Sequence, residues 1–179
     1  MRTFVAVEIG NEAVLDAIVK LQSDMKIRAS PVSKQNMHFT LLFLGEIQDN
    51  QVDDIKKALS NIQFKPIYVK FTRLGVFPNP KFPRVIWIGT DEQSSKQLVD
   101  LATKVEQSLA PLGFKSDKQF KSHLTIFRVK NKIDGIADIL EQFKALDLGS
   151  DTITELKFKK SILTPSGPIY SDLQVVKAK

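Results

Sequence analysis

The sequence of 179 residues contains no cysteine and only two histidines. Without cysteine there can be no disulfide framework, no thiolate nucleophile and no cysteine-ligated zinc site. No apolar run approaches the ~20 residues that a membrane-spanning helix needs. A glutamate soon interrupts the short apolar run at the N-terminus, so we do not expect a signal peptide there. We expect a cytoplasmic protein without a membrane partner.

The composition is otherwise that of an ordinary globular protein, with 42% hydrophobic and 26% charged residues. The length fits one medium domain or two small, closely packed halves. A net charge of +6 suits an anionic partner such as nucleic acid. The lysines are scattered and are dense only at Lys157, Lys159 and Lys160. The charge therefore permits binding of nucleic acid or phosphate esters without requiring it.

Both histidines begin the same pattern, His-x-Thr, inside an apolar, strand-like run. His38 begins HFTLLFL and His123 begins HLTIFRV. Because alternate side chains of a strand share a face, Thr40 lies on the face of His38, and Thr125 lies on the face of His123. The apolar residues between them point to the opposite face, where we expect the core.

Two facing His-x-Thr pairs would suit in-line displacement at phosphorus. An imidazole gains or loses a proton near neutral pH, and a threonine hydroxyl donates a hydrogen bond to an anionic oxygen. One histidine could activate the nucleophile and the other protonate the leaving oxygen, each step worth ~10²–10⁴-fold. A single histidine on an apolar strand is more often structural, but here the motif occurs twice and uses every histidine. Two histidines without a third ligand make an incomplete zinc site, so we expect no metal.

The order strand, helix, His-x-Thr strand, helix, strand occurs twice, with the matching strands displaced by a little over eighty residues. This repeat predicts an α+β fold of two pseudo-symmetric lobes that bring the histidines together. No linker separates the halves, since 78–83 is too short for a tether, so we expect one bilobal domain over 1–179. The expected strands are 3–9, 38–44, 66–74, 84–90, 123–129, 154–163 and 169–176, and the expected helices are 14–25, 52–62, 98–109 and 136–143.

At these residues the chain resembles the two-histidine (2H) phosphoesterases, and most closely the prokaryotic RNA 2′,3′-cyclic phosphodiesterases, also called 2′-5′ RNA ligase-like proteins. The resemblance implies two lobes with antiparallel sheets flanking a central groove and helices outside. It also implies hydrolysis of RNA 2′,3′-cyclic phosphate ends to 2′-phosphomonoesters without metal or other cofactor. The segments that carry it span the chain and read MRTFVAVEI, NMHFTLLFLGEI, GVFPNPKFPRVIWIG, KSHLTIFRVK and SILTPSGPIYSDL.

The resemblance assigns roles to the four motif residues. His38 and His123 would be the general acid and base, with His123 activating water and His38 protonating the 3′ leaving oxygen. Thr40 and Thr125 would hold the phosphate. The implied partner is an RNA that ends in a 2′,3′-cyclic phosphate, such as a tRNA fragment, and we expect the protein to act as a monomer.

Two further residues match family positions five places after each histidine. Arg128 would contact the phosphate, and Phe43 would stack on the base, an interaction worth ~1–3 kcal/mol. Strict alternation puts both on the face opposite the histidines, so a bulge or strong twist would be needed. The pattern alone favours a core position for Phe43 and for Trp87, and a surface position for Arg128. Arg84 and Tyr170 also match recurrent family positions, without a role that we can assign.

The sequence leaves other functions open. The same site could join RNA ends through a 2′-5′ linkage, since water and an RNA 5′-hydroxyl could use one transition-state geometry. A non-catalytic module that binds RNA ends would fit the charge, although binding does not demand two titratable imidazoles. Another cyclic phosphate, such as a cyclic nucleotide or ADP-ribose 1″,2″-cyclic phosphate, would need the same chemistry. The absence of a Walker-type glycine loop argues against an ATP-dependent ligase.

Overall fold

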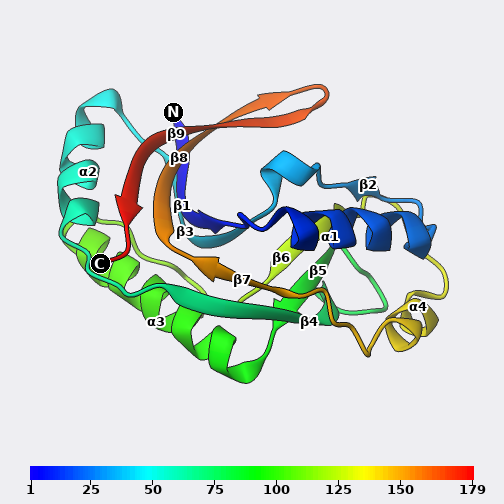
Figure 1. Ribbon diagram of the computed structural model, residues 1–179. Helices are drawn as coiled ribbons and strands as arrows, with labels where there is room; N and C mark the ends of the chain where they lie inside the picture. The colour runs from blue at the N-terminus through cyan, green and yellow to red at the C-terminus, as the bar shows by residue number, and fades with distance from the viewer.

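A computed structural model describes residues 1–179 and shows two antiparallel sheets with helices around them (Figure 1). The α+β class is as expected, and the expected strands and helices are all present. In chain order the elements are β1 Arg2–Glu8, α1 Glu12–Met25, β2 Ser30–Pro31, β3 His38–Glu46, α2 Val52–Ser60, β4 Ile67–Phe77, β5 Val85–Thr90, α3 Glu92–Leu109, β6 Leu124–Arg128, α4 Ile136–Gln142, β7 Ser150–Ile153, β8 Glu155–Thr164 and β9 Gly167–Lys177, with 3-10 turns at Lys34–Asn36, Asp49–Gln51 and Ala110–Leu112.

The two lobes are not the two halves of the chain. One sheet has the order β3-β1-β8-β9 and the other the order β2-β6-β5-β4-β7. In each sheet a His-x-Thr strand lies beside the first strand of its own repeat, and the third strand comes from the other repeat. Strand β4 therefore crosses to the second sheet and β8 returns to the first. This exchange relates the sheets by the expected pseudo-symmetry and interlocks the repeats.

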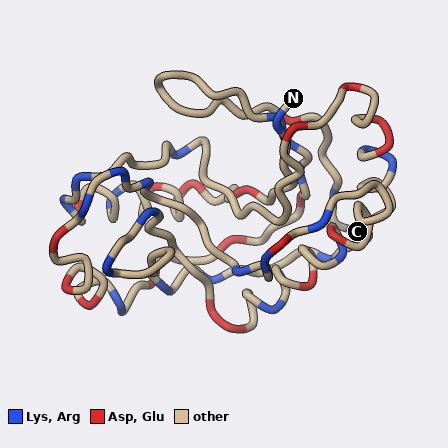
Figure 2. The backbone as a smooth tube through the Cα atoms, turned by 180° about the vertical axis from the view of Figure 1, so that it is seen from behind, with Lys and Arg blue, Asp and Glu red and all other residues tan.

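The helices and the apolar core also join the two repeats. Helix α1 follows β1 of the first sheet but contacts β6, where the Gln22 side-chain amide donates to the Ile126 carbonyl over 2.8 Å. Helix α3 packs against both β3 and β4. A single cluster of 37 buried apolar residues runs through both lobes. Lysine and arginine are distributed over both lobes (Figure 2), and no helix is long and apolar enough to cross a membrane.

The long helices begin where the sequence supplies side-chain caps. The Asn11 side chain accepts a hydrogen bond from the Ala13 amide at the start of α1, and the Asp91 side chain accepts one from the Ser94 amide at the start of α3. Such caps pair backbone donors that the first helical turn leaves without partners. Both helices thus begin directly after the first strand of a repeat, as the sequence pattern indicates.

Trp87 does not lie in the core, contrary to the expectation from its strand. It pairs with Thr125 across β5 and β6, so its half-buried ring lies on the face that carries the second His-x-Thr motif. Gly75 pairs with Trp87 from β4, and the ring occupies the space above this glycine. A Cβ atom at Gly75 would lie 2.3 Å from the ring atom Cζ2. The glycine therefore makes room for the tryptophan.

We expect Gly75→Ala to displace this ring and to lower the free energy of unfolding by about 1–3 kcal/mol, the usual cost of overpacking. Chemical denaturation measures the loss, and the intrinsic fluorescence of the single tryptophan reports the displacement. Gly10→Ala is the matched control, because its Cβ would come no closer than 3.9 Å to Asp151. Equal stability and unchanged fluorescence for both variants would contradict the packing role of Gly75.

Candidate active site

His38 is the first residue of β3, and two hydrogen bonds fix its ring. Its Nδ1 lies 2.7 Å from the Asn36 carbonyl oxygen, and its Nε2 lies 2.9 Å from Thr40 Oγ1. Because a carbonyl oxygen can only accept, Nδ1 carries the proton and Nε2 of the neutral ring is the acceptor. The Thr40 hydroxyl then donates to Nε2. The pair shares one face, as the His-x-Thr spacing predicts.

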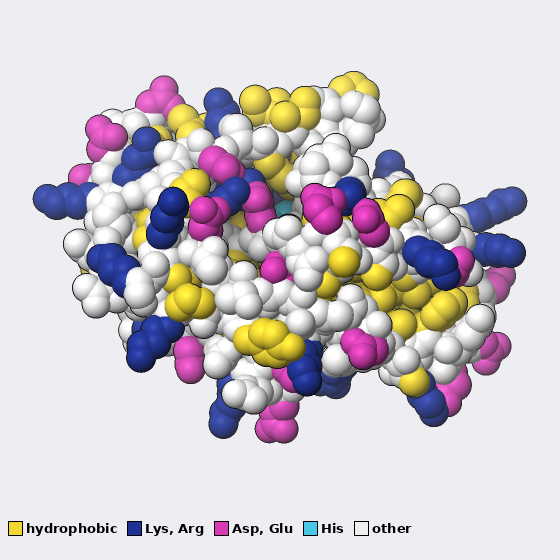
Figure 3. Space-filling model, viewed as in Figure 1, with side chains coloured by type: hydrophobic (Ala, Val, Ile, Leu, Met, Phe, Trp, Pro, Cys, Tyr) yellow, Lys and Arg dark blue, Asp and Glu magenta, His cyan; other side chains and the backbone are white.

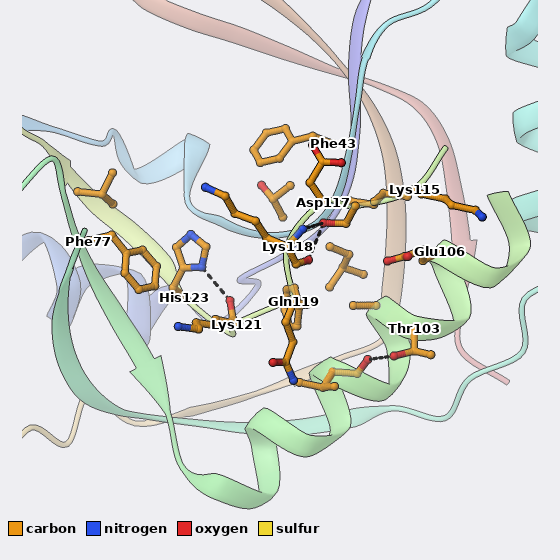
Figure 4. A pocket seen from close by; sticks show the side chains of 18 of the residues that line it. Phe43, Phe77, Thr103, Glu106, Lys115, Asp117, Lys118, Gln119, Lys121 and His123 are labelled. Atoms are coloured by element: carbon orange, nitrogen blue, oxygen red, sulfur yellow. Dashed lines mark hydrogen bonds between the residues drawn. The ribbon is translucent and has the colours of Figure 1, made fainter. Parts of the chain in front are cut away.

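His123 directly precedes β6 and repeats the first of these two hydrogen bonds. Its Nδ1 donates to the Lys121 carbonyl oxygen, 2.8 Å away and again two residues before the histidine. The neutral ring therefore also presents its Nε2 lone pair. Thr40 and His123 line one pocket of about 1270 Å³, which brings the two motifs to the same groove (Figure 4). In Figure 3 a histidine is visible in the hollow below the β8–β9 hairpin.

Two β-bulges bring Phe43 and Arg128 to the histidine face. In β3 the register with β1 shifts between Thr40 and Leu42, so that Leu41 and Leu42 are both buried and Phe43 is 68% exposed. The core position that alternation favours for Phe43 is therefore wrong. In β6 the register with β5 shifts between Thr125 and Phe127, and Arg128 is exposed. An extra residue in a strand reverses the alternation beyond it, so both side chains return to the face of the histidines, and Phe43 lines the pocket.

Each imidazole packs against two aromatic rings. The His38 ring centroid lies 5.1 Å from that of Phe4 and 5.3 Å from that of Tyr170. The His123 centroid lies 5.0 Å from that of Phe77 and 6.4 Å from that of Trp87. These rings exclude water from the imidazoles, which disfavours the charged form.

Burial accordingly lowers the pKa of both histidines. It lowers the pKa of His38 from 6.5 to about 4, and the positive charges of Lys159 and Arg128 act in the same direction. Burial and the charge of Arg128 also lower the pKa of His123. The carbonyl oxygens that accept from Nδ1 oppose the shift at both rings. The charge of Arg128 thus acts on the pKa of both imidazoles.

An ion-pair network lies beside His38 on the groove face of the first sheet. Glu8, which pairs with His38 across β1 and β3, accepts from Lys157 over 2.9 Å and also from Lys159. Asp172 contacts Lys157 at 3.1 Å and Lys159 at 2.6 Å. Lys159 is only 5% exposed. Two lysines of the densest basic stretch are thus neutralised by carboxylates and are not free to bind an anion.

Sequence reasoning did not assign roles to several residues that shape the site. Phe77 and Tyr170 cover the imidazoles from β4 and β9, and Arg84 lines the pocket while its Nη1 donates to the Lys130 carbonyl over 3.1 Å. Strand β4 is an exchanged strand and β9 pairs with the exchanged strand β8, so the exchange brings Phe77 and Tyr170 to the histidines, whereas Arg84 directly precedes β5. No group of three or more His, Asp or Glu side chains is placed to hold a metal ion.

Comparison with solved structures places this architecture in a known group. The protein described as TT0787 of Thermus thermophilus superposes with a TM-score of 0.78 at 25% identity, covering 99% of this chain and 97% of the other. LigT of E. coli in its apo form superposes with a TM-score of 0.80 at 21% identity, covering 99% of this chain and 96% of LigT. Both are similar in fold over nearly their whole lengths.

Sequence comparisons agree with the structural ones. An RNA 2′,3′-cyclic phosphodiesterase of Archaeoglobus fulgidus is 42% identical over 178 residues, covering 98% of this chain and 99% of the relative. One of Methanocaldococcus jannaschii is 38% identical over 174 residues, covering 95% and 96%. The family model described as "LigT like Phosphoesterase" matches twice, at 7–87 and 88–170, which are the two repeats. The chain therefore belongs to the LigT-like phosphoesterase family of the 2H superfamily.

Proposed function

We propose that this protein hydrolyses RNA 2′,3′-cyclic phosphate ends to 2′-phosphomonoesters without a metal ion. The observation that carries the proposal is the paired arrangement of the two motifs: Thr40 and His123 line one pocket, and in each motif the histidine Nδ1 donates to a backbone carbonyl, so that Nε2 of the neutral ring carries the lone pair. The activity named for the relatives supports the same reaction. Both imidazoles come from one chain, so a monomer would suffice for the reaction. We propose that it acts in the cytoplasm on RNA ends such as those of cleaved tRNA.

In this proposal the two histidines act on opposite sides of the phosphorus. His123 Nε2 takes a proton from water as the water oxygen bonds to phosphorus. His38 Nε2 gives a proton to the 3′ oxygen as the bond between that oxygen and phosphorus breaks. The 2′ ester remains, which gives a 2′-phosphomonoester. Each proton transfer is expected to contribute ~10²–10⁴-fold to the rate.

His38 has to be protonated before it can act as the acid. The free site favours neutral imidazoles because burial lowers their pKa values. A bound anionic phosphate would favour the charged form and raise these values. Protonation also removes the lone pair of Nε2 that accepts from Thr40, so that Nε2–H can be directed to the 3′ oxygen. The Thr40 hydroxyl hydrogen is then free to bind a phosphate oxygen.

The remaining site residues would bind the substrate. Thr125 shares the face of His123 and could donate to a second phosphate oxygen. Arg128 supplies a fixed positive charge within reach of both imidazoles and would offset the negative charge of the transition state. Phe43 is exposed in the groove and offers a surface on which the terminal base could stack.

The direct test is incubation of a short RNA that ends in a 2′,3′-cyclic phosphate with the protein in EDTA. We expect the wild type to form a 2′-phosphate, and His38→Ala and His123→Ala each to lose ~10²–10⁴-fold in kcat because each removes one proton transfer. Lys57→Gln, an exposed change on α2, is the control. Addition of a 5′-hydroxyl RNA detects 2′-5′ joining. Binding without turnover by the wild type would instead indicate a non-catalytic module.

Substrates with different leaving groups can show which histidine is the general acid and which is the general base. A phosphodiester with a p-nitrophenolate leaving group needs no proton donor, because p-nitrophenolate is a weak base. We expect His38→Ala to lose at least tenfold less kcat/KM on this substrate than on the RNA end, whereas His123→Ala loses similar amounts on both. The opposite pattern would exchange the two roles.

The protonation states can be followed by NMR titration of the two imidazoles. We expect the His38 resonances of the free protein to titrate near a pKa of about 4, below the usual 6.5, since its surroundings exclude water. A bound 2′-phosphomononucleotide should raise that value, because the phosphate is anionic. His38→Asn leaves one titrating resonance and identifies the signals. An unchanged His38 titration on binding would contradict its role as the acid.

A further inference from the structure

The segment Lys115–Lys121 lies between helix α3 and His123 and forms one wall of the groove. It reads KSDKQFK, and Lys115, Lys118 and Lys121 all line the pocket. All three side chains are exposed, and none takes part in an ion pair. These cations differ from Lys157 and Lys159, which carboxylates neutralise. With Asp117 of the same segment counted, this wall carries a net charge of +2, and Arg84 adds one further unpaired cation to the pocket.

The three lysines lie at increasing distance from His123 in the order Lys121, Lys118 and Lys115 (Figure 4). Lys121 lies beside the site, with its Nζ 5.9 Å from the centroid of the Phe77 ring. Figure 4 shows Lys118 extending across the pocket between His123 and Phe43, and Lys115 further along the wall. The far side of the pocket carries Glu106, which would repel an anion. A polyanion would thus be held near Lys118 and Lys121 and not along α3.

The pocket is also larger than one nucleotide requires. Its volume of about 1270 Å³ exceeds the ~300–1,000 Å³ that is usual for a small-molecule site. In an RNA whose last nucleotide carries the cyclic phosphate, every other phosphate lies on the 5′ side. A strand whose end is at the histidines must therefore leave the site through phosphodiesters 5′ to that end, and the lysine wall is the complementary surface.

We propose that Lys118 and Lys121 bind the phosphodiester groups immediately 5′ to the cyclic phosphate, so that the site selects an RNA strand over a mononucleotide. This inference rests on the proposed function for the identity of the terminal group. Single-stranded nucleic acid that neutralises two lysines changes its log affinity by about 1.4 per unit of log salt, or about sevenfold between 50 and 200 mM. The preference for a strand should carry this salt dependence.

The test compares a nucleoside 2′,3′-cyclic monophosphate with a hexanucleotide that ends in the same group, at low and moderate salt. For the wild type we expect kcat/KM to favour the hexanucleotide, and the preference to fall as salt rises. The double variant Lys118→Gln/Lys121→Gln should lose most of this preference and flatten the salt slope by about 1.4. Lys57→Gln removes a charge on α2, outside the pocket, and should retain both. Thermal unfolding confirms that the variants are folded.

A second readout separates this inference from the proposed function. Fluorescence anisotropy of a labelled hexanucleotide that ends in a 2′-phosphate measures strand binding without turnover. Weaker binding by the double variant supports the lysine wall even if the wild type hydrolyses neither substrate. Equal kcat/KM for the two substrates, with hydrolysis intact, would overturn the inference and leave the proposed function standing. Weaker binding of ATP by the double variant, with strand preference retained, would overturn it in favour of a free nucleotide ligand.

Discussion

The exchange of third strands between the repeats is the constraint on which the rest of the structure depends. Strand β4 completes the sheet of the second His-x-Thr motif, and β8 completes the sheet of the first. Neither sheet can therefore form from one half of the chain, and one apolar cluster serves both. The two histidines are held across a groove by the interlocked body. A flexible pair of domains would not hold the two imidazoles in a fixed relation to each other.

The same exchange creates the environment of the imidazoles. Phe77 reaches His123 from β4, and Tyr170 reaches His38 from β9, the neighbour of β8. These rings exclude water and keep both imidazoles neutral in the free protein. Each Nδ1 donates to a carbonyl two residues earlier, so Nε2 of each neutral ring carries the lone pair, which at His38 accepts from Thr40. The site is thus symmetric in its orientation of the rings. Its asymmetry comes from the Thr40 hydroxyl, which bonds Nε2 of His38, and from Glu8 and Lys159, whose charges act on His38.

Charge is divided between structure and binding in a way that composition does not reveal. The net charge of +6 includes lysines of both kinds. Lys159 is buried between Glu8 and Asp172, where loss of one partner would leave an uncompensated charge in the first sheet. Lys118 and Lys121 have no such partners. The basic stretch that is densest in sequence is therefore the less available one, and the scattered lysines before His123 face the groove.

The sequence by itself determined the element order, the repeat and the four residues of the two His-x-Thr motifs, because these follow from local periodicity and from strand alternation. It could not decide which strands pair, because the apolar pattern of the third strand of each repeat fits either sheet. It also placed Phe43 and Trp87 in the core. Phe43 is brought to the groove by a bulge at Leu41 and Leu42, where the register of β3 with β1 shifts. Trp87 needs the space above Gly75, a residue of another strand. Positions of this kind depend on contacts between distant segments, which only the tertiary structure decides.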